Sequence, residues 1–296
     1  MLSILIPVYN FDIRNLVSEL HCQALQENVP VEIIIIDDAS DKGFCTANRE
    51  IANLSNVSYK ELEKNIGRSK IRNFLSKKAL YDYLLFMDCD ARISSKTYIK
   101  NYVKQCMGEV VVCGGTAYES SEENNDFGLR INYGNKRESK SAQYRNQAPN
   151  NCFSSFNFLI SKSILQRITF DESLTQYGHE DTLFGLELKR HNIKIRHIEN
   201  SLIHLGLDSN PIFLSKALLS VKNLYTIFNN DFYNKELKRD IKLLNYYNKI
   251  KLLGLAPVVG LMYHATQKSI SKNLISRGQN LFYFDMLRLG FLCTLK

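Results

Sequence analysis

The chain has 296 residues, of which 45% are apolar, and it carries 38 Lys and Arg against 30 Asp and Glu. This apolar content excludes a disordered chain, and seven cysteines are too few for a disulfide-stapled miniprotein. No uninterrupted apolar run predicts a membrane-spanning helix, and the N-terminal stretch lacks the basic segment and cleavage site of a secretory signal. We therefore expect a cytoplasmic protein with reduced thiols.

The first 115 residues alternate short apolar runs with amphipathic runs. The apolar runs, which are typical of strands, are Leu2–Ile6, Val31–Ile36, Val57–Lys60, Tyr83–Met87 and Val110–Cys113. The segments between these runs are predicted to be helices, at residues 13–26, 46–54, 68–80 and 95–106. This alternation predicts an α/β fold with a Rossmann-like, mainly parallel central sheet and helices on both faces. Ligands bind beyond the carboxyl ends of the strands in such sheets.

The remainder of the chain changes character twice. Residues 118–150 are polar with little periodicity, which predicts a long loop and suggests a lid that closes over a substrate. Strand-like and helical runs return at 152–160, 180–191 and 193–197, and helical aromatic runs follow at 212–229 and 234–252. We expect two parts, a domain of residues 1–209 and a basic helical subdomain of residues 210–296.

The basic excess belongs to the C-terminal part. Residues 210–296 hold 13 Lys and Arg and 4 Asp and Glu, whereas residues 1–209 hold 25 and 26. Such a segment favours an anionic partner or forms a solvated helical face. No nucleic-acid motif accompanies the charge, so we expect no nucleic acid and a possible peripheral contact with the inner face of a membrane. Leu252–Met262 is too short to span a bilayer, and it fits either the membrane interface or a packed helical core.

Two acidic motifs follow predicted strands. Asp88-Cys89-Asp90 follows Tyr83–Met87, and paired carboxylates at a strand end suit Mg²⁺ or Mn²⁺, although a solvated turn has the same pattern. Asp37-Asp38 follows Val31–Ile36, where a carboxylate can accept hydrogen bonds from a base or ribose or can cap the next helix. Because both motifs lie at strand carboxyl ends, they are predicted to line one crevice.

Three further motifs carry candidate chemistry. Gly67 and Arg72 lie in Asn65–Asn73, where an open backbone and a guanidinium can meet a phosphate, or where a basic helix face is simply solvated. Glu180-Asp181 opens a predicted helix, so these carboxylates either complement the helix dipole or include a general base. His204 is either structural or a third ligand beside two carboxylates.

Taken in order, these motifs resemble those of the inverting, bacterial-type family 2 glycosyltransferases, which have the GT-A fold. The resemblance covers residues 3–206 and does not reach 210–296. It rests on the following segments: Ile6–Asn10, Asp37–Ser40, Asn65–Asn73, Asp88–Asp90, Phe170–Glu172, Gly178–Asp181 and His204–Gly206.

The resemblance implies a reaction and a set of roles. A nucleoside diphosphate sugar, usually a UDP-sugar, gives its hexosyl or N-acetylhexosaminyl group to a hydroxyl of a glycan or lipid-linked glycan during polysaccharide biosynthesis. Asp181 is implied as the catalytic base, and Glu180 is implied to steer the donor or the acceptor. Asp90, His204 and Asp88 are implied as ligands of Mn²⁺ or Mg²⁺. The implied donor-binding residues are Pro7, Tyr9, Asn10, Asp38, Gly67, Arg72, Asp88 and Cys89. His179 and Tyr177 are implied to contact the acceptor.

Physical chemistry agrees with these roles. A cation stabilises the charge that develops on a departing diphosphate, and a carboxylate base removes the proton of a weakly nucleophilic hydroxyl. One base suffices for inversion, whereas a double displacement needs a second carboxylate as nucleophile.

Other classes of protein remain as alternatives. A nucleotidyltransferase shares the fold logic but needs a basic, Gly-rich loop near the N-terminus, which Ile6–Asn10 lacks. A phosphatase would place its acidic pair at the first strand, and a Rossmann dehydrogenase would need G-x-G-x-x-G after it. The non-enzyme alternative is a module that binds a membrane surface or a polyanion through residues 210–296.

Overall fold

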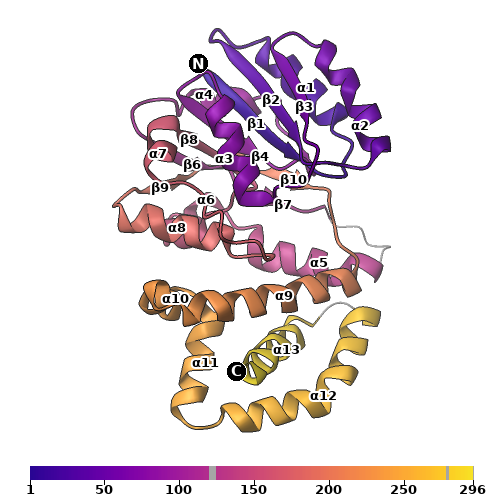
Figure 1. The fold of residues 1–296 in the computed structure, drawn as a ribbon, viewed down its shortest axis with the longest axis vertical. Coiled ribbons are helices and arrows are strands. Elements are labelled where there is room, and N and C mark those ends of the chain that lie inside the picture. The colour runs from indigo at the N-terminus through magenta and orange to yellow at the C-terminus, as the bar shows by residue number, and fades with distance from the viewer. Residues whose placement is uncertain (120–124, 278–279, 296) are drawn as a thin grey trace. The chain divides into compact units, whose positions relative to one another are not determined.

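The computed structural model describes residues 1–119, 125–277 and 280–295 (Figure 1). The chain forms two compact units, each described here by itself. The sheet unit comprises Met1–Tyr118, Ser139–Thr175 and Glu180–Gly206, and the helical unit comprises Glu119–Glu138, Gln176–His179 and Leu207–Lys296. Two segments from earlier in the chain thus group with the C-terminal helices.

A seven-stranded sheet forms the centre of the sheet unit, in the order β3-β2-β1-β4-β8-β6-β9. Its strands are β1 (Leu2–Val8), β2 (Val31–Asp37), β3 (Val57–Glu61), β4 (Tyr83–Met87), β6 (Val111–Cys113), β8 (Asn157–Ser161) and β9 (Ile195–His197). Only β8 runs antiparallel to its neighbours, so the predicted mainly parallel sheet is confirmed. A second sheet has the order β5-β10-β7, with β5 at Ala91–Arg92, β10 at Leu202–His204 and β7 at Thr116–Ala117.

Both faces of the large sheet are covered. Successive side chains of β1 point to opposite faces, so Ile4 and Ile6 enter one hydrophobic cluster and Leu5 enters the other. Residues of α1 (Arg14–Ala24) and α4 (Tyr98–Val103) complete the first cluster. Residues of α3 (Arg68–Lys78), α7 (Lys162–Arg167) and α8 (Glu180–Arg190) complete the second. The remaining helices before residue 118 are α2 (Lys42–Asn48) and η1 (Arg49–Asn53).

The prediction of a long loop over residues 118–150 is wrong for the part that the structure describes. Short helical segments fill it: η2 (Asn125–Phe127), α5 (Gly128–Tyr133), η3 (Gly134–Glu138), α6 (Ala142–Arg145) and η4 (Pro149–Cys152). Leu129 is fully buried in the helical unit, and its amide donates to the Asn210 side chain. Elements of three to six residues are too short to show a helical period, so the sequence did not reveal them. The part of the predicted lid at residues 120–124 lies outside the described residues.

The helical unit contains the predicted C-terminal helices. They are α9 (Asn210–Asn229), η5 (Asp231–Tyr233), α10 (Asn234–Asp240), α11 (Lys242–Leu252), α12 (Ala256–Arg277) and α13 (Leu281–Thr294). The helix predicted over 234–252 is interrupted at Ile241, whose backbone is extended (φ −103°, ψ 111°). Phe213, Leu274 and Phe284 lie in the core of this unit. Among the described residues, no helix combines the length and the apolar character that crossing a bilayer requires.

Candidate active site

The two acidic motifs lie at one edge of the sheet, as predicted. Asp37 is the last residue of β2 and pairs in register with Val8, the last residue of β1. Asp88 directly follows β4, which runs parallel to β1 on its other side. The carboxyl ends of these adjacent parallel strands therefore carry both acidic motifs.

Asp38 ties the end of β2 to the loop that precedes α3. Its Oδ1 accepts from the Ile66 amide at 2.7 Å and its Oδ2 from the Gly67 amide at 3.1 Å. Burial raises the pKa of this carboxyl, and the two amides oppose that shift. Gly67 has φ 86°, a conformation that favours glycine, directly before the first residue of α3. The alternative that Asp38 caps α2 is wrong, because the residue before that helix is Asp41.

The loops after β1 and β2 are joined by hydrogen bonds. Asn10, with φ 50°, donates its amide to Ser40 Oγ at 2.8 Å and accepts from the Asp41 amide at 2.7 Å. Asp37 Oδ1 accepts from the Ser40 amide at 2.7 Å. Close in sequence to the hydrogen-bonded Asn10, Pro7 is half-buried and Tyr9 is exposed.

Arg72 contacts the acidic motif after β4. Its Nη2 donates to Asp88 Oδ1 at 2.6 Å, and its guanidinium lies 5.7 Å from the centre of the Phe170 ring. The residue is buried, and among the described residues its Nε has no hydrogen-bond partner. The guanidinium predicted to meet a phosphate therefore also fixes the position of Asp88.

The other two residues of this motif differ in environment. Cys89 packs against the hydrophobic cluster that contains Ile4 and Ile6, and burial raises the pKa of its thiol to about 12. The thiol is thus protonated at neutral pH. Burial also raises the pKa of Asp90, aided by Asp88 and opposed by His204.

Pairing of β5 with β10 brings His204 to Asp90. Ala91 is the register partner of His204, the Leu205 amide donates to the Asp90 carbonyl at 2.7 Å, and His204 Nε2 lies 3.5 Å from Asp90 Oδ2. A Cβ atom at Gly206 would overlap the Asp90 carboxylate. The rings of Tyr118 and Phe156 flank His204 at centroid distances of 5.6 and 5.2 Å.

Glu180 and Asp181 begin α8 in contrasting environments. Asp181 Oδ2 accepts from the Ser155 amide at 3.0 Å, while its Oδ1 is buried without a hydrogen-bond partner among the described residues. Burial, reinforced by the charge of Glu180, raises the pKa of Asp181 to about 6. Burial also acts on Glu180, but Arg68, 3.1 Å away, and Arg72 outweigh it and hold the pKa of Glu180 below its usual range.

The two residues implied to contact an acceptor belong to the helical unit. His179, with φ 74°, has its Nε2 3.1 Å from Ser220 Oγ of α9. Lys216 Nζ of the same helix lies 5.7 Å from the centre of the Tyr177 ring. Within this unit, both residues are thus held against α9.

The sequence of residues 3–169 matches the family described as glycosyl transferase family 2. The match covers more than half of the chain. The chain belongs to glycosyl transferase family 2.

Two curated proteins that are similar in sequence agree with the assignment of this chain to family 2. Chondroitin synthase of Escherichia coli is 24% identical over 237 residues, which cover 69% of this chain and 34% of that protein. An uncharacterized glycosyltransferase of Haemophilus influenzae is 26% identical over 231 residues, which cover 76% of this chain and 87% of that protein. The family 2 chain thus spans about a third of the length of the chondroitin synthase.

Solved structures confirm the predicted GT-A fold. The mannosyltransferase PcManGT of Pyrobaculum calidifontis, in complex with GDP-Man and Mn²⁺, matches with a TM-score of 0.58 at 14% identity, over 99% of this chain and 85% of that one. Staphylococcus aureus TarS 1–349, in complex with UDP, matches with a TM-score of 0.51 at 18% identity, over 98% and 90%. At these identities the likeness concerns the fold of the family 2 chain.

Several contacts of the family 2 site were not expected from the sequence. The Ser155 amide holds Asp181, Arg68 pairs with Glu180, and Tyr118 and Phe156 enclose His204. Arg68 lies in the basic motif that contains Arg72, so its charge was a usable signal. Ser155 acts through its backbone amide, which every residue type except proline possesses, and therefore leaves no signal.

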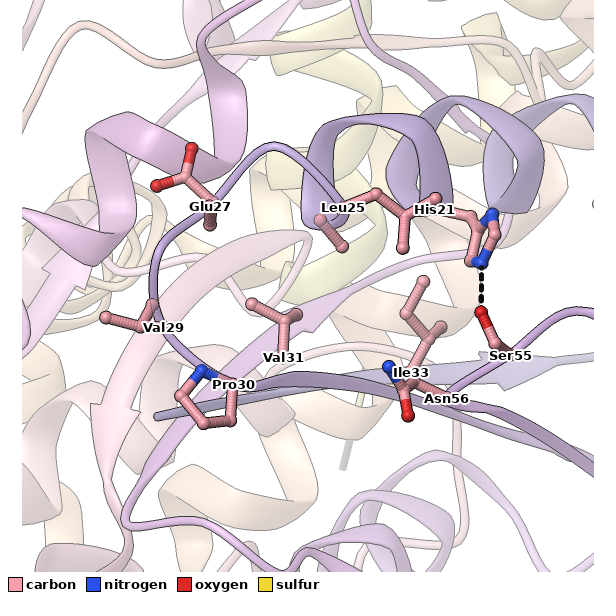
Figure 2. A pocket seen from close by; sticks show the side chains of 10 residues that line it. His21, Leu25, Glu27, Val29, Pro30, Val31, Ile33, Ser55 and Asn56 are labelled. Atoms are coloured by element: carbon pink, nitrogen blue, oxygen red, sulfur yellow. Dashed lines mark hydrogen bonds between the residues drawn. The ribbon is translucent and has the colours of Figure 1, made fainter.

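Figure 2 shows a small pocket elsewhere in the sheet unit. It lies beside the first residue of β2 and the residue before β3, at the amino edge of the sheet and opposite the acidic motifs. His21 and Ser55 contact one another there at 3.1 Å. Its volume of about 190 Å³ is below the roughly 300–1,000 Å³ of typical ligand sites.

Proposed function

We propose that this family 2 chain transfers a sugar from a nucleoside diphosphate sugar, with UDP-sugars as the first candidates, to an acceptor hydroxyl with inversion at the anomeric carbon. The observation that carries the proposal is the environment of Asp181. One oxygen of this carboxyl is held by the Ser155 amide, the other is buried without a partner among the described residues, and its pKa is about 6. A carboxylate with these properties suits a general base near neutral pH.

In the proposed reaction, Asp181 takes the proton of the acceptor hydroxyl as the acceptor oxygen attacks the anomeric carbon. The bond from that carbon to the diphosphate breaks on the opposite face, and its electron pair leaves with the nucleoside diphosphate. Glu180 remains ionised beside Arg68 and helps to orient the substrates. A single displacement of this kind needs no second carboxylate as nucleophile.

We propose that Asp90 and His204 hold a divalent cation, Mn²⁺ or Mg²⁺, beside Asp88. Among the described residues, no three His, Cys, Asp or Glu side chains form a metal-binding group. Two ligands from the protein nevertheless fit these ions, which usually take one or two carboxylates together with substrate phosphates and water. When bound, the cation would stabilise charge on the leaving diphosphate. The Mn²⁺ complex of PcManGT supports this choice of ion.

The remaining proposals concern the residues that bind the donor and the acceptor. Asp38, Gly67 and the end of β1 with the loop after it, which carry Pro7, Tyr9 and Asn10, are proposed to bind the nucleotide. Arg72 is proposed to position Asp88 beside the diphosphate. The UDP and GDP-Man complexes of the two fold relatives support a nucleotide-sugar donor. We propose a glycan or lipid-linked glycan acceptor, which Tyr177 and His179 contact, because a chondroitin synthase is among the sequence relatives.

The test is a panel of nucleotide sugars with Mn²⁺ or Mg²⁺, in which release of nucleoside diphosphate is measured with and without glycan acceptors. Asp181→Asn should lose transfer by about 10²–10⁴-fold while donor binding persists. Asp90→Asn should lose the metal-dependent turnover. Asp82→Asn provides the matched control, because Asp82 is exposed and precedes the same strand β4 that Asp88 follows.

Unchanged transfer by Asp181→Asn would overturn the assignment of the base. Turnover of nucleoside triphosphates with sugar phosphates, and none of nucleotide sugars, would instead identify a nucleotidyltransferase.

A further inference from the structure

An exposed apolar surface lies where α11 and α12 meet, and we call residues 249–262 the α11–α12 corner (Figure 1). Six large apolar side chains in this short stretch face solvent. They are Leu252, Leu253, Leu255, Val258, Leu261 and Met262, with between 46% and 79% of each residue exposed. Single exposed leucines are ordinary, but contiguous apolar surface on a folded chain marks an interaction site.

The core of the helical unit does not use these side chains. The face of α12 that packs on α13 carries Gly260, close to the Cys293 carbonyl, and Tyr263, which lies against Gly290. Val258, Leu261 and Met262 follow helical spacing on the exposed part of α12. Of the two earlier interpretations of Leu252–Met262, a packed helical core is therefore wrong for these residues.

Four backbone amides of the corner donate to carbonyls within it. The amides of Leu253, Gly254 and Leu255 donate to carbonyls of the last turns of α11, and the Val259 amide donates to the Leu255 carbonyl. Gly254 has φ 70°, the left-handed conformation that commonly ends a helix. The turn that presents the leucines thus has hydrogen-bonded amides at Leu253, Gly254 and Leu255, which lowers the cost of bringing it to an apolar phase.

The ionisable Lys, Arg, Asp and Glu residues in the sequence on either side of the corner are all basic. Between Ile241 and Phe284 the sequence contains five Lys and one Arg and no Asp or Glu. Lys249 and Lys251 directly precede the exposed leucines, and both are exposed. Leucines that enter the acyl region while neighbouring lysines stay at the headgroups form the pattern of an interfacial membrane anchor.

We propose that the α11–α12 corner docks this chain on the surface of an anionic lipid bilayer. Apolar burial and attraction to anionic headgroups act together there, and neither requires a spanning helix. A protein partner for the same surface would need acidic groups around an apolar groove, and a second copy of this chain presents the same basic surface. Charge complementarity therefore favours the anionic lipid.

The test is co-sedimentation of the full-length protein with phosphatidylcholine vesicles, prepared with and without phosphatidylglycerol as the anionic lipid. We expect binding only to the anionic vesicles, and weaker binding as salt is raised. Leu253→Glu should abolish binding. Leu80→Glu is the matched control, because Leu80 is 71% exposed and Leu253 is 72% exposed, but Leu80 lies outside the corner and its change should leave binding intact.

A second pair of variants tests the charge. The double substitution Lys249→Gln and Lys251→Gln should weaken binding to anionic vesicles roughly 30-fold, since each lysine near an anionic surface contributes roughly fivefold. Lys100 and Lys104 changed to Gln remove the same charge from the sheet unit and should change binding little.

Equal binding of wild type and Leu253→Glu to anionic vesicles would overturn the proposal. The absence of binding to anionic vesicles would also overturn it. If the wild type were then a dimer that Leu253→Glu dissociates, the corner would be a contact between copies of the chain. Release of nucleoside diphosphate from the donor in solution reports on the proposed function independently of lipid, so the two proposals can fail separately.

Discussion

Arg72 of α3 donates a 2.6 Å hydrogen bond from Nη2 to Oδ1 of Asp88, at the carboxyl end of β4. Arg72 is buried, and a third of the Asp88 side chain is exposed. The pair fixes one carboxylate at the rim of the proposed diphosphate site and keeps a positive charge beneath it. Its strength comes from the ionised donor and acceptor and from the burial of the guanidinium.

The first prediction concerns this pair. Arg72→Lys keeps the charge but loses the planar fork, so Asp88 should lose its fixed position and transfer should fall at least tenfold. The free energy of unfolding should fall by about 1–3 kcal/mol in urea titrations. Arg49→Lys is the control, because Arg49 makes an exposed pair with Glu61 and should change unfolding by less than ~1 kcal/mol. Equal effects of the two variants would contradict the proposed role.

The second prediction concerns the pH dependence of transfer. Asp181 must be ionised to accept a proton, so kcat/KM for transfer should rise with pH through about 6 and then level off. The charged groups acting on it are Glu180, which raises its pKa, and Arg72, which lowers it, and the neutral Cys113 thiol lies nearby. Glu180→Gln should therefore move the rise to lower pH. A rise that stays in place would show that another group titrates.

The third prediction concerns stability. The folded chain holds the Asp181 proton more tightly than the unfolded chain, because burial raises the pKa from 3.8 to about 6. This contribution is fully present below pH 3.8 and is lost as the pH rises through about 6. Asp181→Asn cannot ionise, so its stability relative to wild type, measured by urea midpoints, should increase as the pH rises from 3.8 to about 6 and should then level off. A constant difference between the two proteins would contradict the buried state of the carboxyl.

The fourth prediction concerns Gly206 and Asp90. A methyl group at Gly206 would overlap the Asp90 carboxylate, so Gly206→Ala should displace that carboxylate from His204. We expect half-maximal turnover to require several-fold more Mn²⁺, with partial rescue at high Mn²⁺ and complete loss in EDTA. Gly43→Ala is the control, because a methyl group there meets open space in α2 and should be neutral or stabilise by up to ~1 kcal/mol. An unchanged Mn²⁺ requirement in Gly206→Ala would argue against Asp90 as a ligand.

The fifth prediction concerns the loop before α3. Asn at position 38 has one carbonyl oxygen for two amides, so Asp38→Asn should leave the Ile66 or Gly67 amide without an acceptor. We expect weaker binding of UDP in calorimetry and a loss of about 1–3 kcal/mol in unfolding. Asp41→Asn is the control, because Asp41 directly precedes α2 and its side chain makes no capping hydrogen bond. This variant should change neither the affinity for UDP nor the free energy of unfolding. Normal UDP affinity in Asp38→Asn would remove this loop from the nucleotide site.

The order of strands and helices in residues 1–115 could be predicted from the sequence, because buried strands and amphipathic helices carry distinct apolar periods. The positions of Asp37 and Asp88 followed from the same patterns, since both come directly after apolar runs. The polar segment of residues 125–152 could not be predicted, because its short helices, such as α5, are stabilised by contacts like the Leu129 amide to Asn210.

The sequence by itself thus determined the family, the parallel sheet and the edge at which the acidic side chains gather. Only the tertiary structure decided which groups meet there: the Ser155 amide with Asp181, Arg72 with Asp88, and His204 with Asp90. These partners lie far apart in the chain, and the local periodicity of a sequence carries no information about distant pairs. Burial, which separates the pKa of Asp181 from that of its neighbour Glu180, likewise arises only when the whole chain has packed.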